Sequence, residues 1–205
     1  MSELASWLRH DLKTPLAVIS GFLELLGDDL DVDSRRDVMR RMNQAAAVLG
    51  ELVDDVGAWV LVEAGELEYA LAAEPVVLDD LDDGFVDQIE RSHPAVVVAF
   101  DGTLAGRGDA AYLRHALRLV VAAVDVVAAR DAGPEVLIHG SGRRLDLTLE
   151  GAELGPAELA AVQPGSRPRE RGGRMLALAA TIVRAQGGSV TAARGRIRIE
   201  LAAGS

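Results

Sequence analysis

The chain has 205 residues, of which 49% are hydrophobic and 3% aromatic, and its formal net charge is −11. This charge argues against general binding to nucleic acids or anionic membranes. The absence of cysteine excludes disulfides and thiolate metal sites, and the four histidines lie far apart in sequence, so we expect no metal site. A chain of this length forms one domain or two small ones.

The N-terminal segment, MSELASWLRHDL, is amphipathic and charged, unlike a secretory signal peptide. No window reaches the ~20 apolar residues of a membrane span, because the nearest one, residues 113–129, contains charged side chains. We therefore expect a cytoplasmic protein that binds no membrane.

Two consecutive segments predict a helical hairpin. Large apolar residues recur in alternating steps of four and three at Leu12, Leu16, Ile19, Leu23, Leu26 and Leu30. The same spacing recurs at Val38, Met42, Ala45, Leu49, Leu52, Val56 and Trp59. Between them Ser34 and Asp37 resemble a capping box that opens the second helix. A hairpin alone cannot enclose both seams, so we predict a homodimeric four-helix bundle for residues 1–65.

The hydrophobic period changes after a turn at residues 63–66. Strands are predicted at residues 95–100, 135–139, 145–149 and 189–201, the last with a hairpin turn near Arg194 and Gly195. Helices are predicted at residues 78–91, 109–130 and 173–186, the last ending at two glycines. The expected second domain, residues 66–205, is an α/β sandwich with a mixed or antiparallel sheet, which makes the fold class α+β. Residues 163–174, rich in Pro, Gly and Arg, are expected to form a mobile loop.

A histidine on the first helix is placed for chemistry. His10 and Thr14 both point about 160° away from the leucine seam, one on each side, and share the solvent face. At neutral pH a histidine is largely uncharged, and a ring nitrogen can accept a phosphoryl group. Asp11 can accept the other ring N–H, and Thr14 can position a water for hydrolysis. Pro15 breaks the local rules of a helix at a cost of about 3 kcal/mol, which is typical of a functional site.

The run His10-Asp11-Leu12-Lys13-Thr14-Pro15-Leu16, followed by a hairpin, resembles the H-box of the dimerisation and phosphotransfer domain of histidine kinases. The resemblance implies that His10 is the phosphoacceptor, that Asp11 is its acid/base partner and that Thr14 serves phosphatase activity. Receiver domains of response regulators are then the expected partners.

Small or apolar groups lie one to three turns below His10. They are Ala17, Val18, Gly21 and Phe22. We interpret them as a docking surface for a receiver domain, and packing against the attached domain is an equally good interpretation.

The rest of the chain resembles the ATP-binding catalytic domain of the same family, with three departures. Ala122 stands where an Asn helps to hold Mg²⁺, and an alanine offers no ligand oxygen. The loop that should read adenine contains Glu150, Gly151 and Glu153 but lacks the Asp, and Glu153 would bring negative charge near the phosphates. In the last motif, which retains Gly173, Met175 replaces the glycine that clears room for phosphate.

The family's lid is also shortened, to residues 163–172, so we expect no bound cofactor, with Mg-ATP as the alternative. Its arginines can in principle grip a phosphate, although such a loop is more often only solvated. They are Arg167, Arg169, Arg171 and Arg174.

Three functions follow. The first is a histidine phosphotransferase, similar to the dimeric sporulation and cell-cycle phosphotransferases, that exchanges phosphate between His10 and receiver aspartates without ATP-dependent kinase activity. The lack of a sensor region before His10 favours it. The second is a divergent sensor histidine kinase that still binds ATP and phosphorylates His10. The third is a non-catalytic dimeric partner of receivers or kinases.

Overall fold

In the computed structural model the chain divides into two compact units, residues 1–61 and residues 62–205. The structure describes residues 3–26, 30–72, 74–128 and 133–203, without the side chains of residues 3–11, 69 and 70. Within these ranges no helix has both the length and the hydropathy to cross a membrane.

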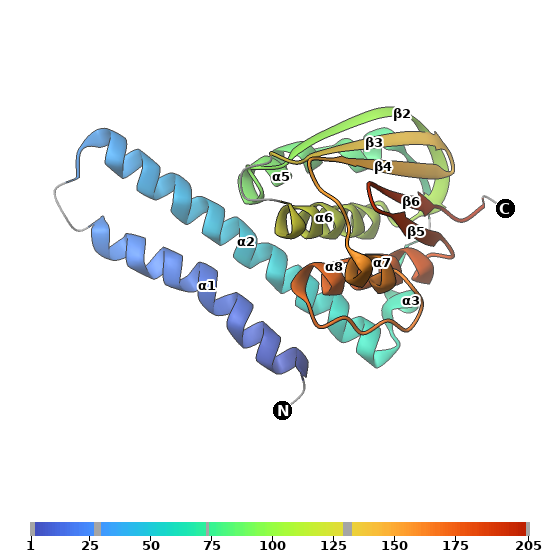
Figure 1. Ribbon diagram of the computed structural model, residues 1–205, viewed down its shortest axis with the longest axis horizontal. Coiled ribbons are helices and arrows are strands. Elements are labelled where there is room, and N and C mark those ends of the chain that lie inside the picture. The colour runs from blue at the N-terminus through green and yellow to red at the C-terminus, as the bar shows by residue number, and fades with distance from the viewer. Residues whose placement is uncertain (1–2, 27–29, 73, 129–132, 204–205) are drawn as a thin grey trace. The chain divides into compact units, whose positions relative to one another are not determined.

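The first unit is the predicted helical hairpin. It consists of α1 (Glu3–Leu25) and α2 (Val32–Ala64), which run antiparallel (Figure 1). Pro15, Val38 and Ala45 are buried along it. The predicted hairpin is confirmed, whereas Leu16 and Leu23 of the seam expected on the first helix are 48% and 55% exposed in a single copy.

The second helix begins one turn earlier than the sequence predicts. Asp31 caps it, because its Oδ1 accepts the backbone N–H groups of Asp33 and Ser34, both at 2.9 Å. The Ser34 hydroxyl donates to Asp31 Oδ2 at 2.6 Å and, with these N–H groups, lowers the pKa of Asp31. The prediction that Ser34 caps this helix is therefore wrong. Asp31 takes that role, since an aspartate caps a helix as well as a serine does.

The second unit contains a six-stranded mixed sheet. Its strands are β1 (Glu74–Val77), β2 (Val97–Gly108), β3 (Glu135–Gly142), β4 (Arg144–Glu150), β5 (Ser189–Ala193) and β6 (Arg196–Glu200). They lie in the order β1-β2-β3-β4-β6-β5. The pair β2 and β3 is parallel and the other neighbours are antiparallel. The mixed sheet predicted from the sequence is confirmed.

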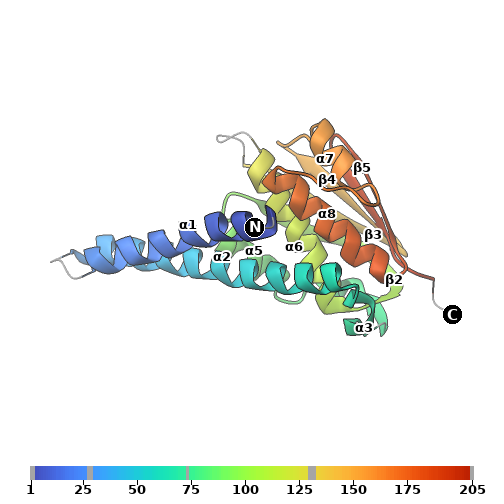
Figure 2. The same ribbon diagram turned by 90° about the horizontal axis from the view of Figure 1, so that it is seen from below.

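Two long helices pack on one face of this sheet (Figures 1 and 2). The helices of the unit are α3 (Leu67–Ala70), α4 (Leu78–Asp82), α5 (Phe85–Ser92), α6 (Ala110–Val127), α7 (Pro156–Ala161) and α8 (Arg171–Ala185). Alternate residues of the central strands, such as Ile138 and Leu147, are completely buried, as are Leu119 of α6 and Ile182 of α8. The core of the unit therefore lies between the sheet and the pair α6 and α8.

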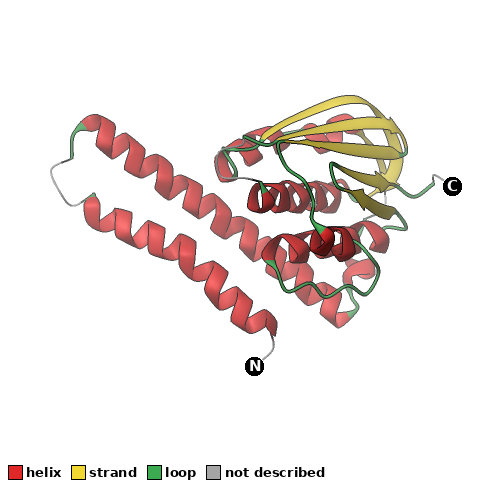
Figure 3. Cartoon of the chain, in the orientation of Figure 1, coloured by secondary structure: helices red, strands yellow, loops and turns green. Residues whose placement is uncertain are grey.

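Several elements differ from those predicted. The single helix expected at residues 78–91 is two helices, because Gly84 adopts a left-handed conformation with φ of +66° between them. The short elements α3, α7 and β1 were not predicted, since four to six residues are too few to show a period (Figure 3). Strand β2 continues through a glycine-rich stretch at which a Cβ on Gly102 would lie 2.2 Å from the Gly140 carbonyl oxygen. Only glycine fits there.

Asp109 joins the start of α6 to the segment that precedes β1. Its Oδ1 accepts the N–H of Tyr112 at 3.1 Å, and its Oδ2 accepts the N–H of Ala72 at 2.9 Å. We expect Asp109→Ala to lower the free energy of unfolding by about 1 kcal/mol, because both N–H groups lose their acceptor. Asp109→Asn, which keeps one acceptor oxygen, should lose less. Urea unfolding measures both changes, and an alanine variant as stable as the original protein would contradict this role.

Candidate functional site

The predicted phosphoacceptor motif lies in the middle of α1. The backbone of His10 and Asp11 belongs to this helix, whereas their side chains lie outside the described residues. Thr14 is exposed and Pro15 is buried. Because proline has no N–H, the carbonyl of Asp11 lacks its helical hydrogen bond. The motif thus lies in a helix that continues through Pro15, and the side chain of Thr14 is on the surface.

The residues predicted to dock a receiver follow on the same helix. Ala17, Val18 and Gly21 are exposed, and a Cβ built on Gly21 would meet no atom within 4 Å. Phe22 is half-buried. The structure therefore places three of these four residues on open surface and turns the fourth toward the neighbouring helix.

An arginine of α2, which the sequence interpretation did not single out, contacts Phe22. The guanidinium carbon of Arg41 lies 5.9 Å from the centre of the Phe22 ring. Arg41 Nε also donates to Asp37 Oδ2 at 2.7 Å, and Arg40 pairs with the other oxygen of the same carboxylate. These hydrogen bonds, first from Arg40 and then from Arg41, lower the pKa of Asp37. The spacing of Asp37 and Arg41 signals an ion pair on one helix, but nothing in the sequence signals the contact across the hairpin.

The residues predicted to stand in degenerate nucleotide motifs lie on α6, on α8 and at the end of β4. Ala122 of α6 is 1% exposed, inside the packed core, and Gly173 and Met175 are buried in the first turns of α8. Glu150 ends β4 and Glu153 follows it, both exposed.

The segment after β4 is fixed by its backbone. Gly151 has a φ of +72°, and the N–H of Leu154 binds the carbonyl oxygen of Arg194 at 2.7 Å. The burial of Ala122 and Met175 shows that both side chains are packed inside the unit. They belong to α6 and α8, two helices that contact each other.

The expected mobile loop at residues 163–174 differs in the structure. Its last four residues form the first turn of α8, and residues 163–170 alone remain outside regular structure. The Arg174 guanidinium donates to the carbonyl oxygen of Arg169, and the Arg184 guanidinium donates to that of Val162. Burial lowers the pKa of Arg184. The loop is therefore anchored at both ends.

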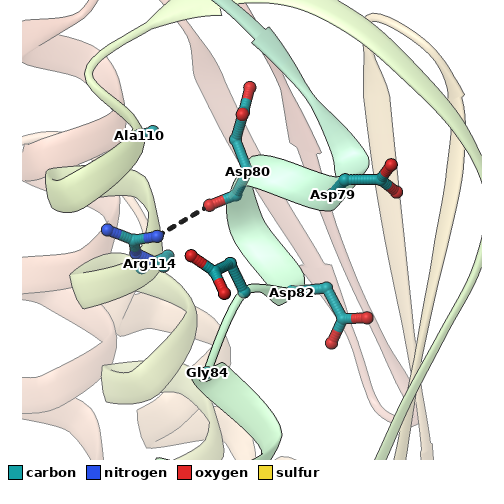
Figure 4. A pocket seen from close by; sticks show the side chains of 7 residues that line it. Asp79, Asp80, Asp82, Gly84, Ala110 and Arg114 are labelled. Carbon is teal, nitrogen blue, oxygen red and sulfur yellow. Dashed lines mark hydrogen bonds between the residues drawn. The ribbon is translucent and has the colours of Figure 1, made fainter.

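A cavity of about 680 Å³ lies between α4 and α6 (Figure 4). It is lined by Asp79, Asp80, Asp82, Asp83, Gly84, Ala110 and Arg114. The one cation among them, Arg114, donates to the backbone oxygen of Asp80 at 2.8 Å. Four carboxylates would repel a polyphosphate, so this cavity does not suit a nucleotide. Nor do the described residues bring together three or more His, Asp or Glu side chains in a group that could hold a metal ion.

Comparisons with known proteins agree with this architecture. Residues 1–58 match the sequence model of the His Kinase A (phospho-acceptor) domain. The histidine kinase AdeS of Acinetobacter baumannii has a similar structure, with a TM-score of 0.58 and 17% identity over 96% of this chain and 98% of that one. A bacterial phosphotransferase is also similar, with a TM-score of 0.54 and 16% identity over 96% of this chain and 92% of that one. A comparison with curated protein sequences returned no match.

Residues 1–58 therefore belong to the His Kinase A (phospho-acceptor) family of domains. The whole chain, a helical hairpin followed by an α/β unit, shares its fold with a histidine kinase and with a bacterial phosphotransferase.

The contact between Arg41 and Phe22 should help to hold α1 against α2. We expect Arg41→Ala to lower the free energy of unfolding of the hairpin by about 0.5–1 kcal/mol, because a cation over an aromatic face is lost. Arg36→Ala is the matched control, since Arg36 pairs with the exposed Asp33 one turn away and such pairs contribute little. Circular dichroism in urea measures both variants, and equal effects would show that the aromatic contact contributes nothing.

Proposed function

We propose that this protein is a histidine phosphotransferase that exchanges a phosphoryl group between His10 and aspartates of receiver domains, without ATP-dependent kinase activity of its own. The observation that carries the proposal is the phosphoacceptor motif, which lies in a helix within the part of the chain that matches the His Kinase A domain. The exposed surface of Ala17, Val18 and Gly21 below the motif supports docking of a receiver.

The chemistry requires little from this chain. One ring nitrogen of His10 attacks the phosphorus of an aspartyl phosphate, so an N–P bond forms as the P–O bond breaks, and the receiver carboxylate leaves. Asp11 accepts the proton of the other ring nitrogen, which stabilises the positive charge that develops on the ring. Mg²⁺ is supplied by the receiver. Thr14, on the exposed side of the helix, positions a water when the phosphoryl group is hydrolysed instead.

The residues present do not fit Mg-ATP. At the position of the metal-holding amide, Ala122 provides no oxygen and is enclosed by the core. Glu153 adds a negative charge where phosphates would lie, and Met175 places a side chain where a glycine would admit them. Because nucleotide binding depends on all three elements together, their joint loss supports a protein that obtains phosphate from another phosphoprotein.

The hairpin supports the proposal of a homodimer. In a single copy Leu23 of α1 is 55% exposed, and Val53 and Val60 of α2 are 60% and 55% exposed. Val60 lies seven residues after Val53, and Met39, also exposed, lies two heptads before it. An exposed apolar stripe with heptad spacing is what a second copy covers in a four-helix bundle.

The source of phosphate tests the proposal most simply. We expect a phosphorylated receiver to label the protein and radiolabelled Mg-ATP to leave it unlabelled, because the chain lacks the groups that hold the nucleotide. His10→Gln should abolish the label. The matched control is His139→Gln, because His139 is an exposed histidine of the other unit. Label from ATP on His10 would establish the divergent kinase instead, and no label from any donor would favour a non-catalytic binding partner.

The dimer has its own test. We expect Val53→Lys to turn the dimer into a monomer, because it places a charge in the apolar stripe where the second copy would bury it. Asp54→Lys, at the next exposed position and outside the stripe, should leave the dimer intact. Light scattering coupled to size-exclusion chromatography measures the mass of each. A wild-type monomer, or a Val53→Lys variant that remains dimeric, would contradict the proposal.

A further inference from the structure

Gly173 has a close neighbour on the side where a Cβ would project. A Cβ built on Gly173 would lie 2.8 Å from Cβ and 3.4 Å from Cγ of Pro168, and 3.7 Å from Cβ of Ala161. The first distance is shorter than atoms of two side chains tolerate. A glycine near the start of a helix can leave room for a phosphate beside the backbone N–H groups. Here a proline ring of the same chain occupies the space beside the Cα of Gly173.

The segment that carries Pro168 is held in place by its neighbours. Arg174 binds the carbonyl oxygen of Arg169, directly after the proline. At the other end Arg184 binds the carbonyl oxygen of Val162, where α7 ends. Within the segment the N–H of Ser166 binds the carbonyl oxygen of Gln163 at 3.2 Å. Two arginines of α8 thus fix both sides of the proline.

We propose that residues 163–170 are a built-in plug of the residual nucleotide pocket, with Pro168 seated on Gly173. The inference rests on the proposed function for the identity of the pocket and adds a second, steric reason why a nucleotide does not enter. Gly173 is then retained for the proline and not for a phosphate. Restoring the lost ligand groups at Ala122 and Met175 would not by itself open the pocket.

The adjacent glycine provides a matched control. A Cβ on Gly172 would lie 3.3 Å from Cγ1 of Val127 and 3.7 Å from the Ala123 carbonyl oxygen, contacts that a small shift relieves. Both glycines lie in the first turn of α8, where alanine is the better helix former. Gly172→Ala and Gly173→Ala therefore differ chiefly in whether the new methyl group meets the proline.

Limited proteolysis with trypsin reports the state of the plug, because the bond after Arg169 lies within it. We expect slow cleavage there in the wild-type protein and in Gly172→Ala, and cleavage about tenfold faster in Gly173→Ala, in which the methyl group expels the proline. The melting temperature should fall in Gly173→Ala. In a Pro168→Gly background the same Gly173→Ala change should no longer lower it, since the obstructing ring is gone.

Cleavage after Arg169 that is already fast in the wild-type protein would overturn the proposal. So would a Gly173→Ala variant that behaves like Gly172→Ala, or one that lowers the melting temperature equally with and without Pro168. These experiments use neither ATP nor a receiver. Their failure would leave the relay function standing. Label from ATP on His10 would overturn both proposals, whereas a protein that takes label from no donor would leave the plug standing.

Discussion

The organisation of this protein depends on a constraint of the helical hairpin: two helices can bury only the faces they turn toward each other. Pro15, Val38 and Ala45 are buried, whereas Leu23 and Val53 remain exposed. In the proposed dimer a second copy covers this further apolar face, and the proposed phosphotransfer uses the surface of α1 that neither contact occupies. The position of Thr14, exposed beside a buried proline, agrees with such a division. The proposed dimer and the proposed use of α1 for phosphotransfer would then both depend on one pattern of apolar residues.

The α/β unit, which has the fold of a histidine kinase domain, is filled by its own side chains. Its sheet and the pair α6 and α8 form a continuous core in which Ala122 is an ordinary buried alanine. Pro168 and the arginines of α8 complete the surface beside Gly173. A fold persists when its core is packed, even after the groups that served a ligand are lost, and function must therefore be argued from individual side chains. This is why likeness to kinases in fold does not decide the source of phosphate.

Sequence patterns predicted the parts of this protein that rest on periodicity. The heptad seams of α1 and α2, and the alternation along β3 and β4, extend over enough residues to reveal their period. The elements β1, α3 and α7 are too short to show a period. The break at Gly84 depends on a left-handed conformation, which a single glycine in the sequence does not predict. For the site, the motif around His10 was readable as a local run of residues. The contacts of Arg41 with Phe22 and of Pro168 with Gly173 join distant or folded-back segments, and no local pattern encodes them.

The central claim is that His10 accepts phosphate from a receiver aspartate. Trypsin cleaves after Arg9 and Lys13, so His10 falls in a tetrapeptide whose mass reports phosphorylation directly. After brief incubation with a phosphorylated receiver and Mg²⁺, we predict that mass spectrometry finds the phosphoryl group on this peptide, at the histidine, while the receiver loses it. A receiver that keeps its phosphate, or a phosphoryl group found on any other peptide of this chain, would contradict the account.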